Sequence, residues 1–570
     1  MTNKDLANII FPDIDKSIEY YENLYPKRNL NEKCAVTRFA PSPTGFMHIG
    51  NFQSAVIDYV LARNTNGVFY LRNEDTDSKR EIEGAMNVIF DTLKNYDMVP
   101  DEYEFNGKVV GNYGPYIQSE RKVIYHTFIK HLIEIGRAYP CFCTKEDLDD
   151  MRKVQEDGKK RIGYYGRYAV CRRLNIDEAI EKIKSGIPYV IRFKSEGDFD
   201  NKIHFEDEVR GRISIPENDQ DIVIMKSSNK LPTYHFAHFV DDYLMRTTHV
   251  VRGEEWLPSV PIHLELFKTF NAVPPKYIHT PLILKKDGDT IRKISKRKDP
   301  EASMSYYKEK GYPKEALIES LMTIINSNYE QWHTANPEKS YLDFEFSAKK
   351  MSSTGGALYD IEKLNNISKN YISKLKAIDV YNGVLEWSKE YDLEFYNILS
   401  NNKDYSISIF NIEREQKKPR KDYENYSSIK SQIWYMFDEL WNKETKEYDL
   451  KTITDLNEIK NILNKYIEIY EEQDDKETWF NKIKSLCDEL GYASDMKAYK
   501  LNPENYKGNV ADVSTVLRVC LTTKSMTPDL YDIMKILGKE RMKKRYNYFI
   551  ERWLHLSFYL VYYLIRVIIW

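Results

Sequence analysis

Two short segments, far apart in the chain, constrain the fold more than any other feature. The first runs from Arg38 to Asn51 and reads Arg-Phe-Ala-Pro-Ser-Pro-Thr-Gly-Phe-Met-His-Ile-Gly-Asn. We expect a strand before its loop, at residues 34–39, and a helix after it, at residues 53–63. A strand, a glycine-bearing loop and a helix N-terminus suit phosphate, because the free amides and the dipole of the helix face the loop. The second segment is the basic sequence Lys293-Ile-Ser-Lys-Arg297.

The residue types in both segments fit a reaction at phosphate. His48 and Lys296 can donate charge-assisted hydrogen bonds to phosphate oxygens, and Gly50 lets the backbone approach a nucleotide closely. Taken singly, each segment also fits a plainer reading, a helix behind a proline-rich turn or a basic loop. Together, in this order, they resemble the paired ATP-binding signatures of class I aminoacyl-tRNA synthetases. The lead-in Ala40-Pro-Ser-Pro-Thr-Gly45 is similar to that of bacterial-type glutamyl-tRNA synthetases.

The resemblance implies an ATP-dependent ligation of L-glutamate to the 3′ end of tRNA(Glu), a step in translation. It would proceed through a glutamyl-adenylate, with release of AMP and pyrophosphate. Negative charge builds on the phosphates during the attack, and donors placed in advance lower that barrier. By motif position the catalytic residues are His48, Lys293 and Lys296. The expected ATP contacts are His48, Gly50, Asn51, Lys293, Ser295 and Lys296, with Mg²⁺ bridging the phosphates. The resemblance further implies that tRNA binds before the first step.

A pocket selective for glutamate needs a fixed cation for the side-chain carboxylate and an anion for the amine. Arginine suits the first role, because its planar fork binds a carboxylate bidentately. Carried over by motif position, the substrate contacts are Arg38, Ala40, Ser42, Glu74, Tyr234, His238 and Arg252. Arg38 and Arg252 are the expected clamps, and Glu74 is the expected partner of the ammonium. Read singly, Glu74 also suits a helix cap, Tyr234 a core position and Arg252 a strand end. His238 stands where many family members have Asn, which leaves its tautomer and charge open.

Three cysteines offer a candidate zinc site. Cys141, Cys143 and Cys171 supply three thiolates, whereas zinc usually takes four ligands. Some relatives in the family bind zinc in this region with two close cysteines, a third cysteine and a Tyr or His. Here the third cysteine is displaced along the chain, so the fourth ligand would be Tyr164, Tyr168 or water. The alternative is three free cysteines in a small subdomain.

The expected fold is an α/β Rossmann-type catalytic core with a mixed α/β insertion, followed by an all-α C-terminal half. Residues 34–39 and 67–77 read as the first strands of a doubly wound sheet, whose ligands bind beyond the carboxyl ends of the strands. The parts that pattern and resemblance together predict are an N-terminal extension (1–33), the first half of the catalytic domain (34–115), an insertion that binds the acceptor stem (116–232), the second catalytic half (233–290), a stem-contact region with the second signature (291–375), an α-helical anticodon-binding region (376–545) and an apolar tail (546–570). The extension is expected to carry one amphipathic helix, with Ile14, Ile18 and Tyr21 on one face.

Composition limits the class of protein. A chain of 570 residues with 42% hydrophobic and 30% charged residues fits a soluble protein of several domains. The net charge is −3, so contacts with tRNA must come from local patches such as the basic run 417–421, which fits a solvated loop equally well. Six scattered cysteines and a residue pattern at 1–33 unlike a signal peptide predict a cytoplasmic protein.

Two segments do not fit this pattern. Lys350-Met-Ser-Ser-Thr354 resembles the second signature but lacks its final lysine and follows the expected sheet, so we interpret it as a loop on the tRNA side. Residues 553–570 are apolar and aromatic, with basic residues just before them. An interfacial membrane anchor fits this tail. A buried terminal helix or a non-native end is favoured, because the resemblance stops near Arg545 and 18 residues are marginal for spanning a bilayer.

Two other functions stay open. A truncated-type glutamyl transferase that modifies a tRNA base lacks an anticodon region, and the helical half after residue 376 argues against it. A non-catalytic tRNA-binding paralogue would have lost catalysis, and the intact His48, Lys293 and Lys296 argue against it. Charging of tRNA(Gln) beside tRNA(Glu) depends on side chains that the sequence does not identify. We expect a monomer with no obligate protein partner.

Overall fold

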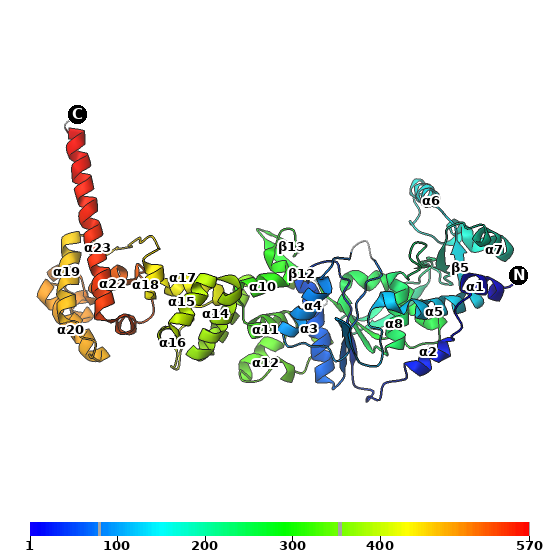
Figure 1. Cartoon of the computed structure of the whole chain (residues 1–570), viewed down its shortest axis with the longest axis horizontal. Coiled ribbons are helices and arrows are strands. Elements are labelled where there is room, and N and C mark those ends of the chain that lie inside the picture. The colour runs from blue at the N-terminus through cyan, green and yellow to red at the C-terminus, as the bar shows by residue number, and fades with distance from the viewer. Residues whose placement is uncertain (78–80, 352–355, 569–570) are drawn as a thin grey trace. The chain divides into compact units, whose positions relative to one another are not determined.

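The computed structural model describes the backbone of residues 1–77, 81–351 and 356–568, and the side chains of these as far as Arg552 (Figure 1). The chain divides into two compact units. The first comprises Met1–Lys308 and Leu317–Ile361, and the second comprises Glu309–Ala316 and Glu362–Trp570. Among the helices of the described part, none is both long and apolar enough to cross a membrane. The predicted apolar tail beyond Arg552 has its side chains outside the described residues.

The core of the first unit is the predicted Rossmann-type sheet. Strands β1 (Val36–Phe39) and β2 (Val68–Leu71) pair in parallel, and α3 (Ile49–Asn64) connects them. Strand β10 (His249–Gly253) pairs in parallel with β11 (Lys276–Thr280). The β1 and β10 ends meet where the Thr248 amide donates to the Val36 carbonyl at 3.0 Å. All four residues of β1 are buried, as expected for a parallel strand that is covered on both faces.

The predicted insertion does not form a separate body throughout. Its strands β5 (Ala138–Cys141), β6 (Val190–Phe193) and β9 (Val223–Met225) form a sheet of their own. Strands β7 (Lys202–Asp207) and β8 (Gly211–Pro216) instead extend the core sheet, because β7 pairs with β11. The residue pair in that contact is Asp207 and Tyr277. The end of β7 therefore lies within the catalytic half of the fold.

The N-terminal extension contains two helices, so the prediction of one helix is wrong. The helices are α1 (Asn3–Ile10) and α2 (Ile18–Leu24), each capped at its start by a hydroxyl side chain. Ile14 lies between them, because Pro12 follows the end of α1 and cannot continue it. Figure 1 shows α1 beside α5 (Lys122–Glu134), with which it packs. Leu6, Phe11 and Tyr21 are buried in the same core as the sheet.

A small sheet carries the second signature. Strands β12 (Ile283–Asp287) and β13 (Thr290–Lys293) form a hairpin that leads into the basic loop. Strand β14 (Ala357–Leu358) adds to β12 in parallel. The chain therefore returns to this sheet directly after the segment that resembles a second signature, whose residues 352–354 lie outside the described residues. The remaining elements of this part of the chain are α4 (Ala85–Asn95), β3 (Tyr103–Phe105), β4 (Lys108–Val110), α6 (Lys145–Asp157), α7 (Ile176–Lys184), α8 (Tyr234–Leu244), α9 (Val260–Thr269), α10 (Met304–Lys310), α11 (Lys314–Ile325) and α12 (Tyr329–Ala335).

From residue 361 onward the regular elements of the described chain are helices, as predicted. They are α13 (Ile361–Lys374), α14 (Ala377–Tyr391), α15 (Leu393–Asn401), α16 (Lys403–Asn411), α17 (Tyr426–Ile433), α18 (Asp438–Trp441), α19 (Leu456–Ile469), α20 (Lys476–Leu490), α21 (Met496–Leu501), α22 (Val510–Thr522) and α23 (Leu530–Ile568). A 3₁₀ turn at Trp434–Met436 separates α17 from α18. Helix α23 is kinked at Gly538, whose φ of 76° favours glycine.

Candidate active site

The first signature places His48 at the N-terminus of α3. The Nδ1 atom of His48 accepts a hydrogen bond from the Gly50 amide at 3.0 Å, so the imidazole caps the helix. A Cβ at residue 50 would lie 3.3 Å from that ring nitrogen, which explains the glycine. Burial lowers the pKa of His48, and the charges of Lys296 and Lys293 lower it further. The imidazole is therefore neutral at neutral pH.

The structure brings the two predicted signatures together. The Lys296 ammonium donates to the Phe46 carbonyl, and the Met304 amide donates to the Met47 carbonyl at 3.0 Å. Lys293 and Lys296 are exposed, and the charges of both act on His48 at the start of α3. Asn51 is exposed in the first turn of α3, and Ser295 is half-buried in the basic loop.

One carboxylate holds the shape of the basic loop. Asp299 accepts a bidentate pair from Arg292 at 2.7 and 2.8 Å and a bond from the Ser295 amide at 2.9 Å. The hydrogen bonds from Arg292 lower the pKa of Asp299. The loop is thus preorganised by its own charges while Lys293 and Lys296 stay exposed.

The carboxyl ends of β1 and β2 bring the predicted pocket residues side by side. The Arg72 amide donates to the Phe39 carbonyl, and the Glu74 amide donates to the Pro41 carbonyl, both at 3.0 Å. Ala40 and Ser42 therefore lie on the loop that faces Glu74. Glu74 is buried and accepts a hydrogen bond from Arg72 at 3.0 Å. The next helix among the described residues, α4, has Gly84 at its N-cap, so Glu74 does not cap that helix.

Three buried arginines and three buried carboxylates form a network of ion pairs near this loop. Arg72 contacts Asp242 at 2.7 Å and Glu74 at 3.0 Å. Arg38 lies 3.4 Å from the same Asp242, and Arg121 donates to Asp241 at 2.7 Å. Burial alone would raise the pKa of Asp242, but the charges of Arg72 and Arg38 outweigh it and hold the pKa well below its usual range. Burial also raises the pKa of Glu74, against the opposing charge of Arg72.

Arg252 is the exception in this charged pocket. Its side chain is buried, yet none of the carboxylates among the described residues pairs with it. Its Nε donates to His279 at 3.1 Å, its Nη1 lies 3.3 Å from His263, and its guanidinium stacks over Tyr277 at 4.8 Å. Its Nη2 is buried and lacks a hydrogen-bond partner within the described chain. A buried cation that lacks a carboxylate partner is suited to pair with an anion.

Tyr234 and His238 lie near these charges. Burial raises the pKa of the Tyr234 hydroxyl, and the charges of Arg252, Glu74 and Arg38 act on it, so this hydroxyl lies near the two predicted clamps and Glu74. His238 Nδ1 lies 2.9 Å from Asp242 Oδ2. Burial nevertheless lowers the pKa of His238 to about 3, against the opposing charge of Asp242. His238 is neutral at neutral pH.

Sequence reasoning missed four residues that build this pocket. Arg72 and Asp242 join the end of β2 to α8, and His263 and His279 contact Arg252. Two signals were available: charged residues crowd the end of β2, and His238 and Asp242 stand at the helical spacing i, i+4. The partners lie far apart in the chain, so no local pattern pairs them.

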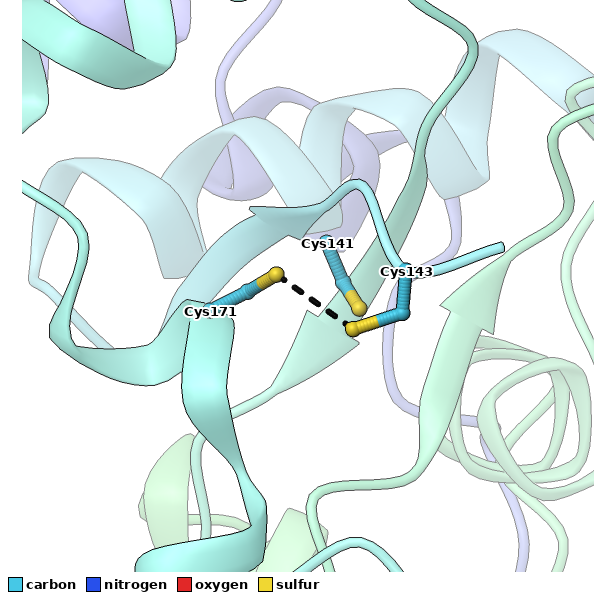
Figure 2. A group of neighbouring side chains, drawn as sticks. All are labelled: Cys141, Cys143 and Cys171. Carbon is cyan, nitrogen blue, oxygen red and sulfur yellow. Dashed lines mark hydrogen bonds between the residues drawn. The ribbon is translucent and has the colours of Figure 1, made fainter. Parts of the chain in front are cut away.

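The three cysteines meet as predicted. Their sulfurs lie within 4.8 Å of one another, and Figure 2 shows them pointing to one place from two segments. The Tyr164 hydroxyl lies 3.4 Å from the Cys141 sulfur and 3.3 Å from the Cys143 sulfur. Hydrogen bonds from Cys143 and Cys171 lower the pKa of Cys141. Tyr168 instead accepts a hydrogen bond from Arg167, which favours Tyr164 as the fourth group.

Comparisons with known proteins agree with this geometry. Residues 35–365 match the family model of class I tRNA synthetases (E and Q), catalytic domain, and residues 503–550 match that of the anticodon binding domain. A glutamate–tRNA ligase of Clostridium perfringens is 48% identical over 552 residues, 96% of this chain and 100% of that protein. One from Acetivibrio thermocellus is 47% identical, over 96% of this chain and 99% of that protein.

A solved structure gives the same result for the fold. It is a glutamate tRNA ligase from Elizabethkingia meningosepticum in complex with its amino acid, with a TM-score of 0.73 at 28% identity. The match covers 91% of this chain and 99% of that chain. The fold and the two signatures are those of a class I aminoacyl-tRNA synthetase. Within that class, this chain belongs to the glutamate–tRNA ligase family.

Proposed function

We propose that this chain ligates L-glutamate to the 3′ end of tRNA(Glu) at the expense of ATP. The observation that carries the proposal is the buried Arg252, which pairs with no carboxylate among the described residues and whose Nη2 lacks a hydrogen-bond partner there. Arg252 and Glu74 both act on the hydroxyl of Tyr234. A free carboxylate pairs with Arg252, and an ammonium pairs with Glu74. Glutamate has both groups at the two ends of a short chain.

The reaction has two steps. An oxygen of the α-carboxylate attacks the α-phosphorus of ATP, the bond to the bridging oxygen breaks, and pyrophosphate leaves. A ribose hydroxyl of the terminal adenosine then attacks the acyl carbon, and AMP leaves. His48, Lys293 and Lys296 stabilise the phosphate charge, with Gly50, Asn51 and Ser295 lining the nucleotide. Positioning and electrostatics supply the catalysis, with no covalent intermediate on the enzyme.

The roles of the pocket residues follow from their partners. Arg252 binds the side-chain carboxylate, and Arg38, held by Asp242, binds the substrate from the opposite side. Ser42 and Ala40 on the adjoining loop complete the wall, with His238 below them as a neutral hydrogen-bonding group. Mg²⁺ would bridge the phosphates and offset their charge when ATP is bound.

The seven-part division of the chain supplies the sites for tRNA. The insertion at 116–232 and the region at 291–375 would contact the acceptor stem, and residues 376–545 would read the anticodon. We extend the proposal to a cytoplasmic monomer that requires tRNA for adenylate formation. Whether tRNA(Gln) is also charged is an outcome of the experiment below.

The cysteine cluster suits a zinc ion. Three thiolates are the donor set that zinc prefers, and the Tyr164 hydroxyl lies at hydrogen-bonding distance from two of the sulfurs. Cys141, Cys143, Cys171 and Tyr164 would hold the ion, which would pin the two segments of the insertion to each other. Metal analysis of the purified protein checks this: one zinc per chain is expected, with loss in Cys143→Ser, and zinc-free protein of equal activity contradicts it.

Aminoacylation with labelled glutamate on purified tRNA(Glu) and tRNA(Gln) tests the function, with Lys296→Ala alongside. Charging of tRNA(Glu) that the substitution abolishes or severely reduces is expected. Charging of both tRNAs makes the enzyme non-discriminating. A folded protein that charges neither tRNA, and shows no tRNA-dependent ATP–pyrophosphate exchange, contradicts the proposal and favours a non-catalytic tRNA-binding protein.

A further inference from the structure

The orientation of Arg252 depends on a histidine that must accept a hydrogen bond. Its Nε donates to Nε2 of His279 at 3.1 Å. Since an arginine has donors only, Nε2 of His279 carries no proton. Burial lowers the pKa of His279, so its single proton resides on Nδ1. That nitrogen lies 2.6 Å from Oδ2 of Asp207 and donates to it.

The carboxylate behind this histidine is itself fixed. Asp207 is buried at the end of β7, and its Oδ1 accepts hydrogen bonds from the amides of Val209 at 3.1 Å and Arg210 at 3.0 Å. Its Oδ2 is therefore the atom that faces His279. Asp207, His279 and Arg252 form a chain of hydrogen bonds in which each group has one allowed direction.

We propose that Asp207 and His279 are positioning residues for substrate recognition: Asp207 fixes the His279 tautomer whose Nε2 accepts from Arg252 and so aims that guanidinium at the substrate carboxylate. The inference rests on the proposed function, because it assigns Arg252 to the glutamate side chain. Neither residue touches the substrate. Strand β7 comes from the inserted part of the chain, so this part of the chain helps to shape the amino-acid pocket.

The tautomer makes a sharp prediction for Asp207→Asn. The amide oxygen must stay where Oδ1 accepts the two backbone amides, which leaves the NH₂ group facing His279. That group donates to Nδ1 of His279 and drives the imidazole proton to Nε2. Two donors then face each other between His279 and Arg252, and the guanidinium turns away. The side chain is nearly unchanged in size, so the fold is kept.

The experiment compares steady-state aminoacylation of tRNA(Glu) by wild type, Asp207→Asn and Asp200→Asn. Asp200 carries the same substitution at an exposed site just before β7. In Asp207→Asn, the KM for glutamate should rise roughly tenfold to a hundredfold, as expected for a lost charged hydrogen bond. The KM for ATP and the melting temperature should stay close to wild type. Asp200→Asn should match wild type throughout.

A second pair of variants tests the route through His279. His279→Gln offers an oxygen acceptor to Arg252 that has no tautomer, so its KM for glutamate should stay within a few-fold of wild type. Adding Asp207→Asn to His279→Gln should then change the KM less than twofold. An unchanged KM in Asp207→Asn overturns the proposal, as does a full additional loss in the double variant. If the glutamine variants fail to fold by circular dichroism, the comparison of Asp207→Asn with Asp200→Asn still decides.

Failure of this inference and failure of the proposed function are distinguishable. The wild-type protein alone answers the second question, since charging of tRNA with glutamate does not depend on any variant. A wild type that charges tRNA(Glu) with an Asp207→Asn variant of unchanged KM contradicts the positioning role only.

Discussion

The amino-acid pocket and the nucleotide site treat charge in opposite ways. In the pocket the charged side chains of Arg38, Arg72, Asp242 and Glu74 are buried and paired with one another. At the nucleotide site Lys293 and Lys296 are exposed. Each region thus reaches specificity by a different physical route.

The difference follows from what each region must recognise. A buried charge costs several kcal/mol unless it is paired. An unpaired buried arginine such as Arg252 should therefore bind strongly to an anion placed at one position. An exposed lysine loses less free energy than a buried one when it has no partner, because water solvates its charge. Such lysines bind a highly charged group such as triphosphate without strict geometry.

Removal of the open guanidinium should have the largest effect. In Arg252→Ala, kcat/KM for glutamate should fall roughly 10³- to 10⁴-fold, because two charged hydrogen bonds to the substrate are lost. Arg252→Lys keeps the positive charge but loses the two-pronged guanidinium, so its kcat/KM should lie between those of wild type and Arg252→Ala. Steady-state aminoacylation measures all three, and an alanine variant within tenfold of wild type is incompatible with the assigned role.

The network of buried arginines and carboxylates around Arg72 should contribute strongly to the free energy of unfolding. Arg72→Met leaves Glu74 buried without its cation and leaves Asp242 with Arg38 alone, which should lower the free energy of unfolding by about 3–5 kcal/mol. Arg152→Met breaks the exposed pair with Asp149, where both side chains are more than half exposed, and should cost no more than about 1 kcal/mol. Urea denaturation followed by circular dichroism compares them. Equal losses of unfolding free energy in the two variants would mean that the buried network stabilises the protein no more than an exposed ion pair does.

The nucleotide site should respond in rate rather than in stability. Lys296→Ala should lower kcat for tRNA-dependent ATP–pyrophosphate exchange roughly 10²- to 10³-fold, as for other single donors to developing charge. Lys298→Ala removes an exposed cation from the same loop and should stay within a few-fold of wild type. Similar losses of kcat in both variants would mean that the positive charge of the whole loop matters, and not a hydrogen-bond donor at the position of Lys296.

The buried histidines should make the protein sensitive to acid. The pKa of His238 is about 3 in the folded chain, against an ordinary value of 6.5. Below pH 6.5 the unfolded chain takes up a proton that the folded chain refuses, so stability falls by about 1.4 kcal/mol per pH unit for this residue. His238→Asn should therefore reduce the stability difference between pH 7 and pH 5 by about 2 kcal/mol.

The matched control for this pH effect is His204→Asn, because His204 is exposed on β7. The pH dependence of its unfolding free energy should equal that of wild type. Guanidinium denaturation at several pH values gives the slopes. A His238→Asn variant with the wild-type slope would show that His238 does not stay neutral in the folded chain.

Much of the fold and part of the site could be predicted from local pattern. The β1 strand, the α3 helix and the meeting of His48 with Lys296 follow from a strand, a glycine loop and a basic segment in a known order. The three cysteines also met as expected.

The parts that could not be predicted depend on contacts between distant segments. Arg72 meets Asp242 only after the two halves of the sheet assemble. Strand β7 reads as part of the insertion, and its pairing with β11 is what carries Asp207 to His279. The prediction of a single helix in the N-terminal extension failed for a local reason, because Pro12 ends the first helix before the expected apolar face begins.

The central claim is that the pocket recognises glutamate through the unpaired charge of Arg252. The most direct test is the ratio of kcat/KM for glutamate over glutamine, in wild type and in Arg252→Gln, with tRNA(Glu) as acceptor. We expect a large preference for glutamate in wild type and the loss of most of that preference in the variant. A variant that keeps the wild-type preference for glutamate would contradict it.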